Sequence, residues 1–395
     1  MKILITGALG FVGFHLSARL RQLGLDVTGL DNGWFNGNAA VGASPEISRR
    51  RAVLNEAPGG LHDVDVSNVR ALRGLLRRTA PTHIVHLAGL SVTGLARREP
   101  SLAVRANIGA TQRLLQEAAL VGSVQRVVFA SSSMVYGHFD SQPCSETVPC
   151  APIEPYGASK LATEILVAAW GRAHGVETTV ARLSSIYGAG DLNGRVTELF
   201  VEAALSGRPM ELFEQGRERL DLTHIEDATA GLHLALTSPA AANQVVNLSR
   251  GDARSLEELA DIIGAYVPGA SKEKLLGGSQ SPRRGTLDIG KARELLGFKP
   301  LVSLEEGIRR TLLARGVTVP ATEIDRVSPR MPASRPPGRD VRAVGRSLVG
   351  GVDRGAGNVA LEKELASYLG RGHRLSLSGG GDRRRVAHLF RQRGL

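Results

Sequence analysis

Short apolar runs alternate with amphipathic stretches along the first 320 residues. The apolar runs, which have the length of buried strands, lie at 2–6, 26–30, 63–66, 83–87, 124–130 and 177–183. Between them, apolar residues recur at helical spacing over 14–23, 69–76, 102–120 and 156–174. This alternation predicts an α/β fold, a doubly wound, Rossmann-like parallel sheet with helices on both faces.

A glycine-rich turn separates the first strand from the first helix, with Gly7, Gly10 and Gly13 spaced G-x-x-G-x-x-G. The second strand ends at Asp31. Strand, glycine turn, helix, strand and terminal acid are typical of a dinucleotide-binding unit, in which a pyrophosphate lies at the helix N-terminus. A carboxylate at Asp31 would accept hydrogen bonds from ribose hydroxyls and repel a 2′-phosphate, which favours NAD over NADP.

Tyr156 and Lys160 stand four residues apart at the start of a predicted helix and therefore share one face. A nearby ammonium lowers the pKa of a phenol, and such a phenol can exchange protons with a sugar hydroxyl. Ser131, Ser132 and Ser133 follow the fifth strand, at the sheet edge where parallel sheets bind ligands. The alternative for the tyrosine is a surface helix without chemistry.

Composition and charge narrow the class of protein. The net charge is +11, but residues 321–395 contain 15 Lys and Arg against 7 Asp and Glu, so +8 of it lies there. The rest of the chain is nearly neutral and the basic tail has no interleaved aromatic residues, which argues against nucleic-acid binding.

Several other classes of protein are not indicated. No apolar run reaches the roughly 18 residues of a membrane span, and no secretory leader is recognised. Cys144 and Cys150 are the chain's two cysteines, too few for a disulfide framework, and no residues have metal-ligand spacing. A cytoplasmic protein without a metal site is expected.

From residue 1 to about residue 317, the chain resembles the extended short-chain dehydrogenase/reductase family, in its NAD-dependent nucleotide-sugar epimerase/dehydratase branch. The matching segments occur in the family's order and spacing. They are TGALGFVG from Thr6, Asp31-Asn32, HLA from His86, Asn107, SSSMVYG from Ser131, YGASK from Tyr156, Arg182 with Tyr187-Gly188, DLTHIED from Asp221, NLS from Asn247, SLEEL from Ser255 and LGFKP from Leu296.

The resemblance implies a role for each matching residue. Tyr156 would be the acid/base, Lys160 would bind the nicotinamide ribose and lower the tyrosine pKa, and Ser132 would be the catalytic serine. Other positions would contact NAD, namely Gly7, Gly10, Phe11, Val12, Gly13, Asp31, Asn32, Asp65, Val66, Leu87, Ala88 and Asn107. The substrate would be a nucleotide-diphosphate sugar, with a UDP- or dTDP-sugar favoured.

The resemblance allows more than one reaction. Related 4,6-dehydratases carry an acid pair directly after the catalytic Ser or Thr, whereas this chain has Ser133 and Met134 there. Epimerisation at C4 through a 4-keto sugar is therefore preferred over dehydration. The length of the segment after Asn32 is similar to that in UDP-glucuronate 4-epimerases. A net oxidoreductase and a non-catalytic NAD-binding scaffold stay open as alternatives.

On the substrate side, this chain departs twice from the family pattern. Ser185 replaces an asparagine expected to bind the diphosphate, and Leu220 replaces an arginine. Arg217, Arg219 and Arg283 are candidate replacements, because guanidinium groups match phosphate geometry. The alternative for each, with equal weight, is a solvated arginine on the surface. Ser132, Ser133, Ser185, Arg219 and Arg283 form the predicted substrate-binding set.

The expected domains follow the resemblance. Residues 1–185, joined again by 221–249, would bind NAD, while 186–220 and 250–317 would form a smaller substrate lobe. The helices at 102–120 and 156–174 would form a homodimer interface. Residues 318–395 would be a linker and extension, in which 358–370 resembles the opening helix of sugar aminotransferases; we expect no aminotransferase activity from such a fragment.

Overall fold

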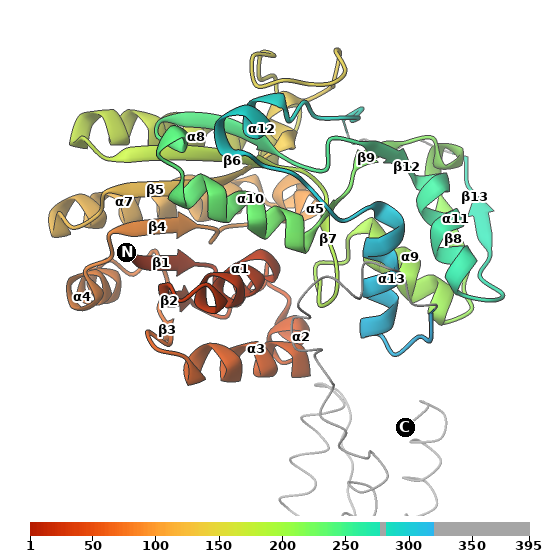
Figure 1. Cartoon of the computed structure of the whole chain (residues 1–395), viewed down its shortest axis with the longest axis horizontal. Coiled ribbons are helices and arrows are strands. Elements are labelled where there is room, and N and C mark those ends of the chain that lie inside the picture. Colours follow the sequence, from red (N-terminus) through yellow and green to blue (C-terminus); the bar gives the residue numbers. More distant parts are fainter. Residues whose placement is uncertain (277–281, 320–395) are drawn as a thin grey trace, which may run out of the picture. The chain divides into compact units, whose positions relative to one another are not determined.

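A seven-stranded parallel sheet forms the centre of the computed structural model, which describes residues 1–276 and 282–319 (Figure 1). Its strands are β1 (Lys2–Thr6), β2 (Asp26–Asp31), β3 (Leu61–Asp63), β4 (His83–His86), β5 (Arg126–Ser132), β6 (Glu177–Leu183) and β11 (Gln244–Leu248). The spatial order is β11-β6-β5-β4-β1-β2-β3. The predicted doubly wound fold is confirmed.

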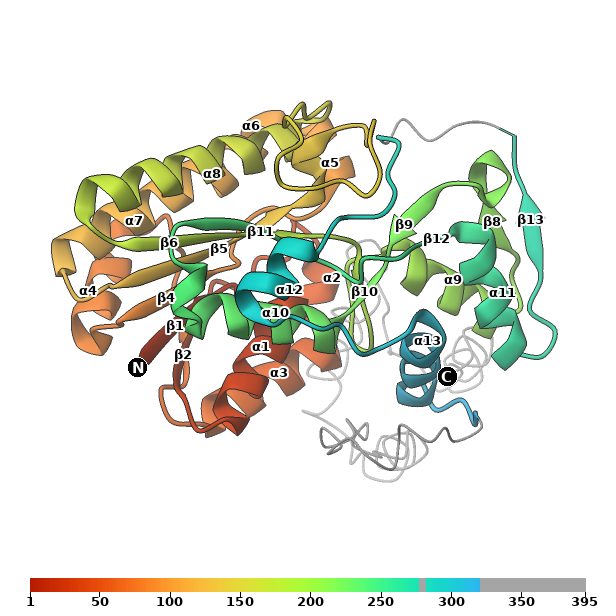
Figure 2. The ribbon, with the colours of Figure 1, turned by 45° about the horizontal axis from the view of Figure 1, so that its top comes forward.

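Helices cover both faces of this sheet (Figure 2). One face carries α1 (Phe11–Gln22), α3 (Pro45–Glu56), α10 (Ile225–Thr237) and α12 (Gly290–Leu296). The other carries α4 (Val69–Thr79), α7 (Ala110–Val121) and α8 (Pro155–His174). Each layer has its own apolar core against the sheet, built around Leu16 and Leu232 on the first face and Leu75 and Leu114 on the second.

Strand order reverses at β1, which pairs with β2 on one side and β4 on the other. Chain segments that leave β1 and β4 at their carboxyl ends run to opposite sides, and this opens a crevice at the sheet edge. Gly7, Asp31, Leu87 and Ser132 all stand at or just after such strand ends. The topology therefore brings the predicted site residues to one edge.

Two predicted elements differ in the structure. The strand expected at 63–66 is β3 at Leu61–Asp63, so Asp65 and Val66 lie beyond it, where Asp65 bonds to Ser67 in a turn. The helix expected over 102–120 is interrupted, with α6 (Pro100–Ala103) followed by the π-helix η1 (Val104–Gly109) and then α7. Such π-turns often mark functional sites, and this one carries Asn107.

A second cluster of buried apolar residues lies in a smaller lobe, shown on the right in Figure 2. Its helices are α9 (Val196–Leu205), α11 (Leu256–Tyr266) and α13 (Leu304–Ala314). Its strand pairs are β8 (Met210–Leu212) with β13 (Lys272–Lys274) and β9 (Arg219–Asp221) with β12 (Ala253–Ser255). The segment 250–317, predicted to belong to this lobe, contributes to both cores. Its residues Ile289, Leu296 and Phe298 pack into the core beside the large sheet.

Short elements complete the described chain. They are α2 (Ala39–Gly42), α5 (Thr93–Arg98), β7 (Ile186–Tyr187) paired with β10 (Thr223–His224), and the 3-10 turns η2 (Ser133–Tyr136), η3 (Phe213–Gly216) and η4 (Pro239–Ala241). The tail beyond 319, including the helix expected at 358–370, lies outside the described residues.

Candidate active site

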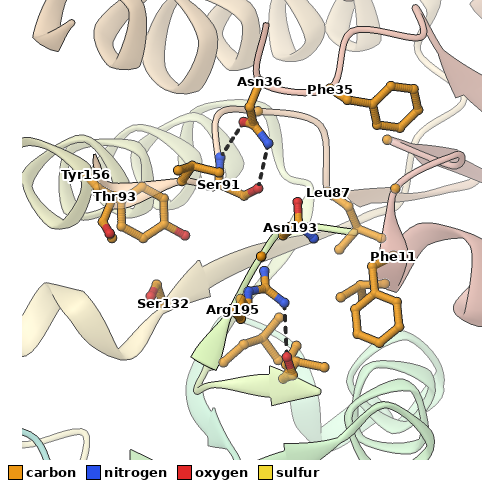
Figure 3. Close-up of a pocket in the computed structure, with 18 of the residues that line it drawn as sticks. Phe11, Phe35, Asn36, Leu87, Ser91, Thr93, Ser132, Tyr156, Asn193 and Arg195 are labelled. Carbon is orange, nitrogen blue, oxygen red and sulfur yellow. Dashed lines mark hydrogen bonds between the residues drawn. The ribbon is translucent and has the colours of Figure 1, made fainter. Parts of the chain in front are cut away.

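A cavity of about 1090 Å³ lies along the carboxyl edge of the sheet and extends to the smaller lobe. Figure 3 shows part of its wall, with Ser132 and Tyr156 on one side and Phe11 and Leu87 on the other. Arg195 enters from the segment between β7 and α9. This volume slightly exceeds the roughly 300–1,000 Å³ typical of small-molecule pockets, as expected for a cavity that holds a ligand larger than a single small molecule.

The glycine turn forms one end of the cavity. Gly10 is the N-cap of α1 and has no side chain that could accept hydrogen bonds from the helix. The N–H groups of the first turn therefore stay available to an anion. A Cβ at Gly13 would lie 2.0 Å from the Gly7 carbonyl oxygen, and one at Gly7 would lie 2.8 Å from the nitrogen of Ala88. Only glycines permit this close backbone packing, and the resulting cradle fits a pyrophosphate.

Asp31 lies beside the turn and is 8% exposed. Its carboxylate accepts hydrogen bonds from the N–H of Leu9 at 3.0 Å and of Gly33 at 2.8 Å. Burial raises the pKa of Asp31, while these two hydrogen bonds oppose the rise. Asn32 donates to Asp65 at 2.8 Å, so both lie where an adenosine would meet the strand ends. These groups fit a dinucleotide.

Asn107 does not line the cavity and is 3% exposed. Its side-chain oxygen accepts from the N–H of Leu90 at 2.8 Å, and its amide donates to Ser159 at 2.8 Å. A Cβ at Gly89 would lie 2.5 Å from the Asn107 oxygen. The residue predicted to contact the cofactor thus ties the turn after Ala88 to the helix of Tyr156.

Ser132, Tyr156 and Lys160 all line the cavity, as the sequence pattern predicts. The Ser132 hydroxyl accepts from the N–H of Met134 at 3.2 Å, which fixes it at the start of η2. Lys160 donates to the carbonyl oxygen of Ala130 at 2.9 Å, and its ammonium lies 4.9 Å from the centre of the Phe129 ring. Strand β5 therefore holds both partners of the tyrosine.

Burial raises the pKa of Tyr156, and two neighbours lower it: the charge of Arg195 and a hydrogen bond from Ser132. Burial also lowers the pKa of Lys160 to about 8, while Glu164 opposes this change. The cation that acts on the phenol in this structure is thus Arg195, a residue the sequence pattern did not single out. A hydroxyl placed next to Tyr156 would meet a phenol, a serine and a guanidinium.

Ser185 also lines the cavity, in a left-handed conformation with φ of 35°. Arg284 donates to the Ser185 hydroxyl at 3.3 Å and lies 3.7 Å from a Glu218 carboxylate oxygen. Its Nε is buried without a partner. Arg284 thus brings a guanidinium, a group suited to phosphate oxygens, to the cavity wall.

The other predicted substrate residues lie elsewhere. Arg283 is 76% exposed and pairs with Asp140 at 3.4 Å, and Arg219 is half exposed and bonds to the Ala253 carbonyl oxygen. Ser133 is buried, and none of the three lines the cavity, nor does Arg217. Arg284, the immediate neighbour of the predicted Arg283, does line the cavity.

Other kinds of site are not seen in the described part of the chain. Within residues 1–276 and 282–319, no group of three or more His, Cys, Asp or Glu side chains is arranged to hold a metal ion. Among the helices of those same ranges, none has the length and apolarity needed to cross a bilayer. Cys144 and Cys150 are both free thiols.

Comparison with known proteins agrees with this geometry. The model of the NAD dependent epimerase/dehydratase family matches residues 3–249. The chain belongs to this family. The match covers the glycine turn, Asp31, Ser132, Tyr156 and Lys160, so the predicted family, enzyme class and NAD dependence are confirmed.

Individual members of the family are moderately similar to this chain. UDP-glucuronate 4-epimerase 4 of Arabidopsis thaliana is 30% identical over 332 residues, which cover 78% of this chain and 74% of that protein. A dTDP-glucose 4,6-dehydratase of an Actinoplanes strain is 30% identical over 325 residues, 79% of this chain and 97% of that protein.

The fold of a solved family member is also similar. The crystal structure of UDP-glucuronic acid 4-epimerase from Bacillus cereus, in complex with UDP-glucuronic acid and NAD, superposes with a TM-score of 0.72. It is 26% identical and covers 79% of this chain and 98% of that one. Family members of this kind thus include both epimerases and dehydratases.

Proposed function

We propose that the chain is a nucleotide-sugar epimerase that inverts C4 of its substrate through a transient 4-keto sugar. The observation that carries this proposal is the convergence of Ser132, Tyr156 and Lys160 on one cavity wall, in the cavity that also contains the glycine turn and Asp31. NAD, when bound there, would supply the hydride acceptor and donor.

The residues around the sugar each have a task. Tyr156, as phenolate, takes the proton from the C4 hydroxyl, and Ser132 donates a hydrogen bond to the same oxygen as it becomes a ketone. After the ketone has turned over, Tyr156 returns the proton. Lys160 holds the nicotinamide ribose, while Arg195 supplies positive charge near the phenol.

Dehydration is the less favoured alternative, although the dTDP-glucose 4,6-dehydratase is as similar in sequence as the epimerases. Elimination between C5 and C6 needs a second acid/base pair after the catalytic serine. Here those positions hold Ser133, which is 1% exposed, and Met134, which has no titratable group. Net oxidation of the sugar remains the other alternative.

The proposed substrate is a UDP- or dTDP-sugar, as in the relatives named above. Arg284 and Ser185 would bind its diphosphate. We also propose a cytoplasmic homodimer joined through the face of α7 and α8, where Leu120 and Ile165 are 61% and 63% exposed.

The test is incubation of the protein with UDP-, dTDP- and GDP-sugars, with and without added NAD. An epimer formed without accumulation of NADH supports the proposal, whereas stoichiometric NADH supports an oxidoreductase. A 4-keto-6-deoxy product would identify a dehydratase. Absence of any product with the whole panel would contradict all three and favour a binding protein.

A further inference from the structure

Arg50 is a fully enclosed arginine, 1% exposed, on helix α3. One guanidinium nitrogen donates to the carbonyl oxygen of Leu9 at 2.9 Å, and the other terminal nitrogen donates to the carbonyl oxygen of Gly190. Its Nε pairs with Glu46 at 2.9 Å. A single side chain therefore joins two backbone segments, at positions 9 and 190, that are 181 residues apart in the sequence.

The first segment is the glycine turn. Leu9 lies inside it, and its N–H donates to Asp31 at 3.0 Å while its carbonyl oxygen accepts from Arg50. The two peptide groups on either side of the Leu9 Cα are thus each held by a hydrogen bond. The N–H groups of the glycine turn must point at a pyrophosphate. The orientation of the turn therefore decides how the cofactor would lie.

The second segment connects β7 to α9 and carries Arg195. Next to Gly190, Asp191 is 3% exposed, accepts from the N–H of Asn193 at 3.1 Å and lies 3.5 Å from the Arg195 guanidinium. Arg195 in turn donates to the carbonyl oxygen of Ile186 at 3.0 Å and lies at the cavity near Tyr156 (Figure 3). The place of Arg195 thus depends on this segment.

The contact at Gly190 is close. Gly190 has φ of +84°, and a Cβ there would lie 3.1 Å from a Glu46 carboxylate oxygen and 3.2 Å from Arg50 Nη2. A side chain would therefore be strained by the backbone and crowded by the ion pair. The positive φ and the close approach both favour glycine where the segment passes Arg50 and Glu46.

We propose that Arg50 is a positioning residue, which fixes the segment carrying Arg195 to the glycine turn and so sets both the cofactor end and the acid–base end of the site. Arg50 itself does not line the cavity. The charges that act on Arg50 are those of Glu46, Arg49 and Asp191. The charge that acts on Tyr156 is that of Arg195. The turnover readouts below rest on the proposed epimerase function, whereas the binding and titration readouts do not.

Two substitutions at Arg50 separate the effect of its charge from the effect of its hydrogen bonds to the carbonyl oxygens of Leu9 and Gly190. Arg50→Met keeps much of the volume but leaves the carbonyl oxygens of Leu9 and Gly190 without donors. Arg50→Lys keeps the charge, but a single ammonium cannot reproduce the guanidinium fork that reaches both carbonyls. Arg49→Met is a matched control. Arg49 is the neighbouring residue, and it also pairs with Glu46, at 2.7 Å, and lies over the Phe14 ring. Among the described contacts, none joins Arg49 to Leu9 or Gly190.

The experiment compares wild type with these three variants in retained NAD, kcat, KM and the pH profile of kcat. For Arg50→Met we expect kcat to fall on the order of 10²-fold, since small misplacements in a site have effects of this size. The acid limb of the profile should move to higher pH, because Arg195 no longer lowers the phenol pKa, and retained NAD should fall. Arg50→Lys should give values of kcat, acid limb and retained NAD between those of Arg50→Met and wild type. Arg49→Met should match wild type in all three.

Other results would overturn the proposal. An unchanged pH profile and unchanged NAD content in Arg50→Met would reduce Arg50 to a structural role, even if its melting temperature falls. If Arg50→Met does not fold, Arg50→Lys decides by the same two readouts. If wild type converts no nucleotide sugar, the proposed function fails, and Arg50 is then judged by NAD retention and by the ultraviolet titration of Tyr156, taken as the difference from Tyr156→Phe.

Discussion

Lys160 donates a hydrogen bond to the carbonyl oxygen of Ala130 at 2.9 Å, which ties the ammonium to strand β5 two residues before Ser132. Because this ammonium is buried, its pKa falls to about 8. The lysine is thus kept in place by the strand that delivers Ser132, the proposed catalytic serine, at some cost to its charged form.

Replacing Lys160 by Met should therefore separate activity from stability. We expect kcat to fall on the order of 10²-fold, because Lys160 is proposed to hold the nicotinamide ribose and small misplacements in a site have effects of this size. The free energy of unfolding at pH 7 should change by less than about 2 kcal/mol, because relief of the buried charge offsets the lost donor to Ala130. Steady-state kinetics and urea unfolding measure both quantities. The exposed Lys299→Met serves as control, and equal loss in both variants would refute the role of Lys160.

Tyr156→Phe removes the only group proposed to exchange the C4 proton. We expect kcat to fall by about 10²–10⁴-fold while NAD stays bound, since the phenyl ring is retained. Full turnover in this variant would show that the mechanism is wrong.

Ser132→Ala should act differently from Tyr156→Phe. Ser132 lowers the pKa of Tyr156 through a hydrogen bond, so its loss should raise that pKa and move the acid limb of the kcat profile to higher pH. The fall in kcat at neutral pH should then be partly recovered at alkaline pH. A profile that only scales down, without moving, would contradict this account.

Local sequence could predict those parts of the site whose residues all belong to one strand end or one helix. The glycine turn, Asp31 and the Tyr156–Lys160 pair are set by a strand end or one helical turn, so their spacing made them candidates, and the resemblance to the family supplied their expected roles. Asn107 was assigned to the cofactor because its position matches the family, but its contacts to Leu90 and Ser159 depend on the π-helix, which periodicity did not reveal.

The arginines could not be predicted in this way, because tertiary packing decides which guanidinium faces the cavity. Arg283 and Arg284 are adjacent and chemically identical, yet Arg283 turns to Asp140 and Arg284 to Ser185. Arg195 follows the Tyr187–Gly188 turn by several residues and matched none of the segments that carried the resemblance. Its position near Tyr156 follows from Asp191 and the carbonyl oxygen of Ile186.

The two adjacent arginines offer a direct comparison. Arg284→Ala should raise KM for the nucleotide sugar by about 10-fold or more, as expected for loss of a charge-assisted hydrogen bond to phosphate, with a smaller effect on kcat. Arg283→Ala should leave KM within about twofold, because its pair with Asp140 is exposed. Titration calorimetry with the nucleoside diphosphate alone gives a second measurement. A larger effect in Arg283→Ala would reverse the assignment.

Stability should fall in acid because of buried, uncharged histidines. His86 is 1% exposed and lies between Thr6 at 2.7 Å and Thr111 at 2.8 Å, and burial lowers its pKa to about 3. Between pH 6.5 and about 3, the unfolded chain binds a proton that the native chain does not, so unfolding becomes easier by about 1.4 kcal/mol for each pH unit. His224, with pKa lowered to about 3, acts in the same direction.

Asp221 opposes this trend, because burial raises its pKa to about 6 and the native chain holds its proton more tightly between about pH 6 and 3.8. His86→Gln isolates the histidine: the amide can still bond to both threonines but does not titrate there. Urea unfolding at pH 6.5, 5.5 and 4.5 should show wild type losing stability relative to His86→Gln by about 1.4 kcal/mol per unit. Parallel curves for the two proteins would mean that His86 is protonated in the native state, and that its bonds to Thr6 and Thr111 do not keep it neutral.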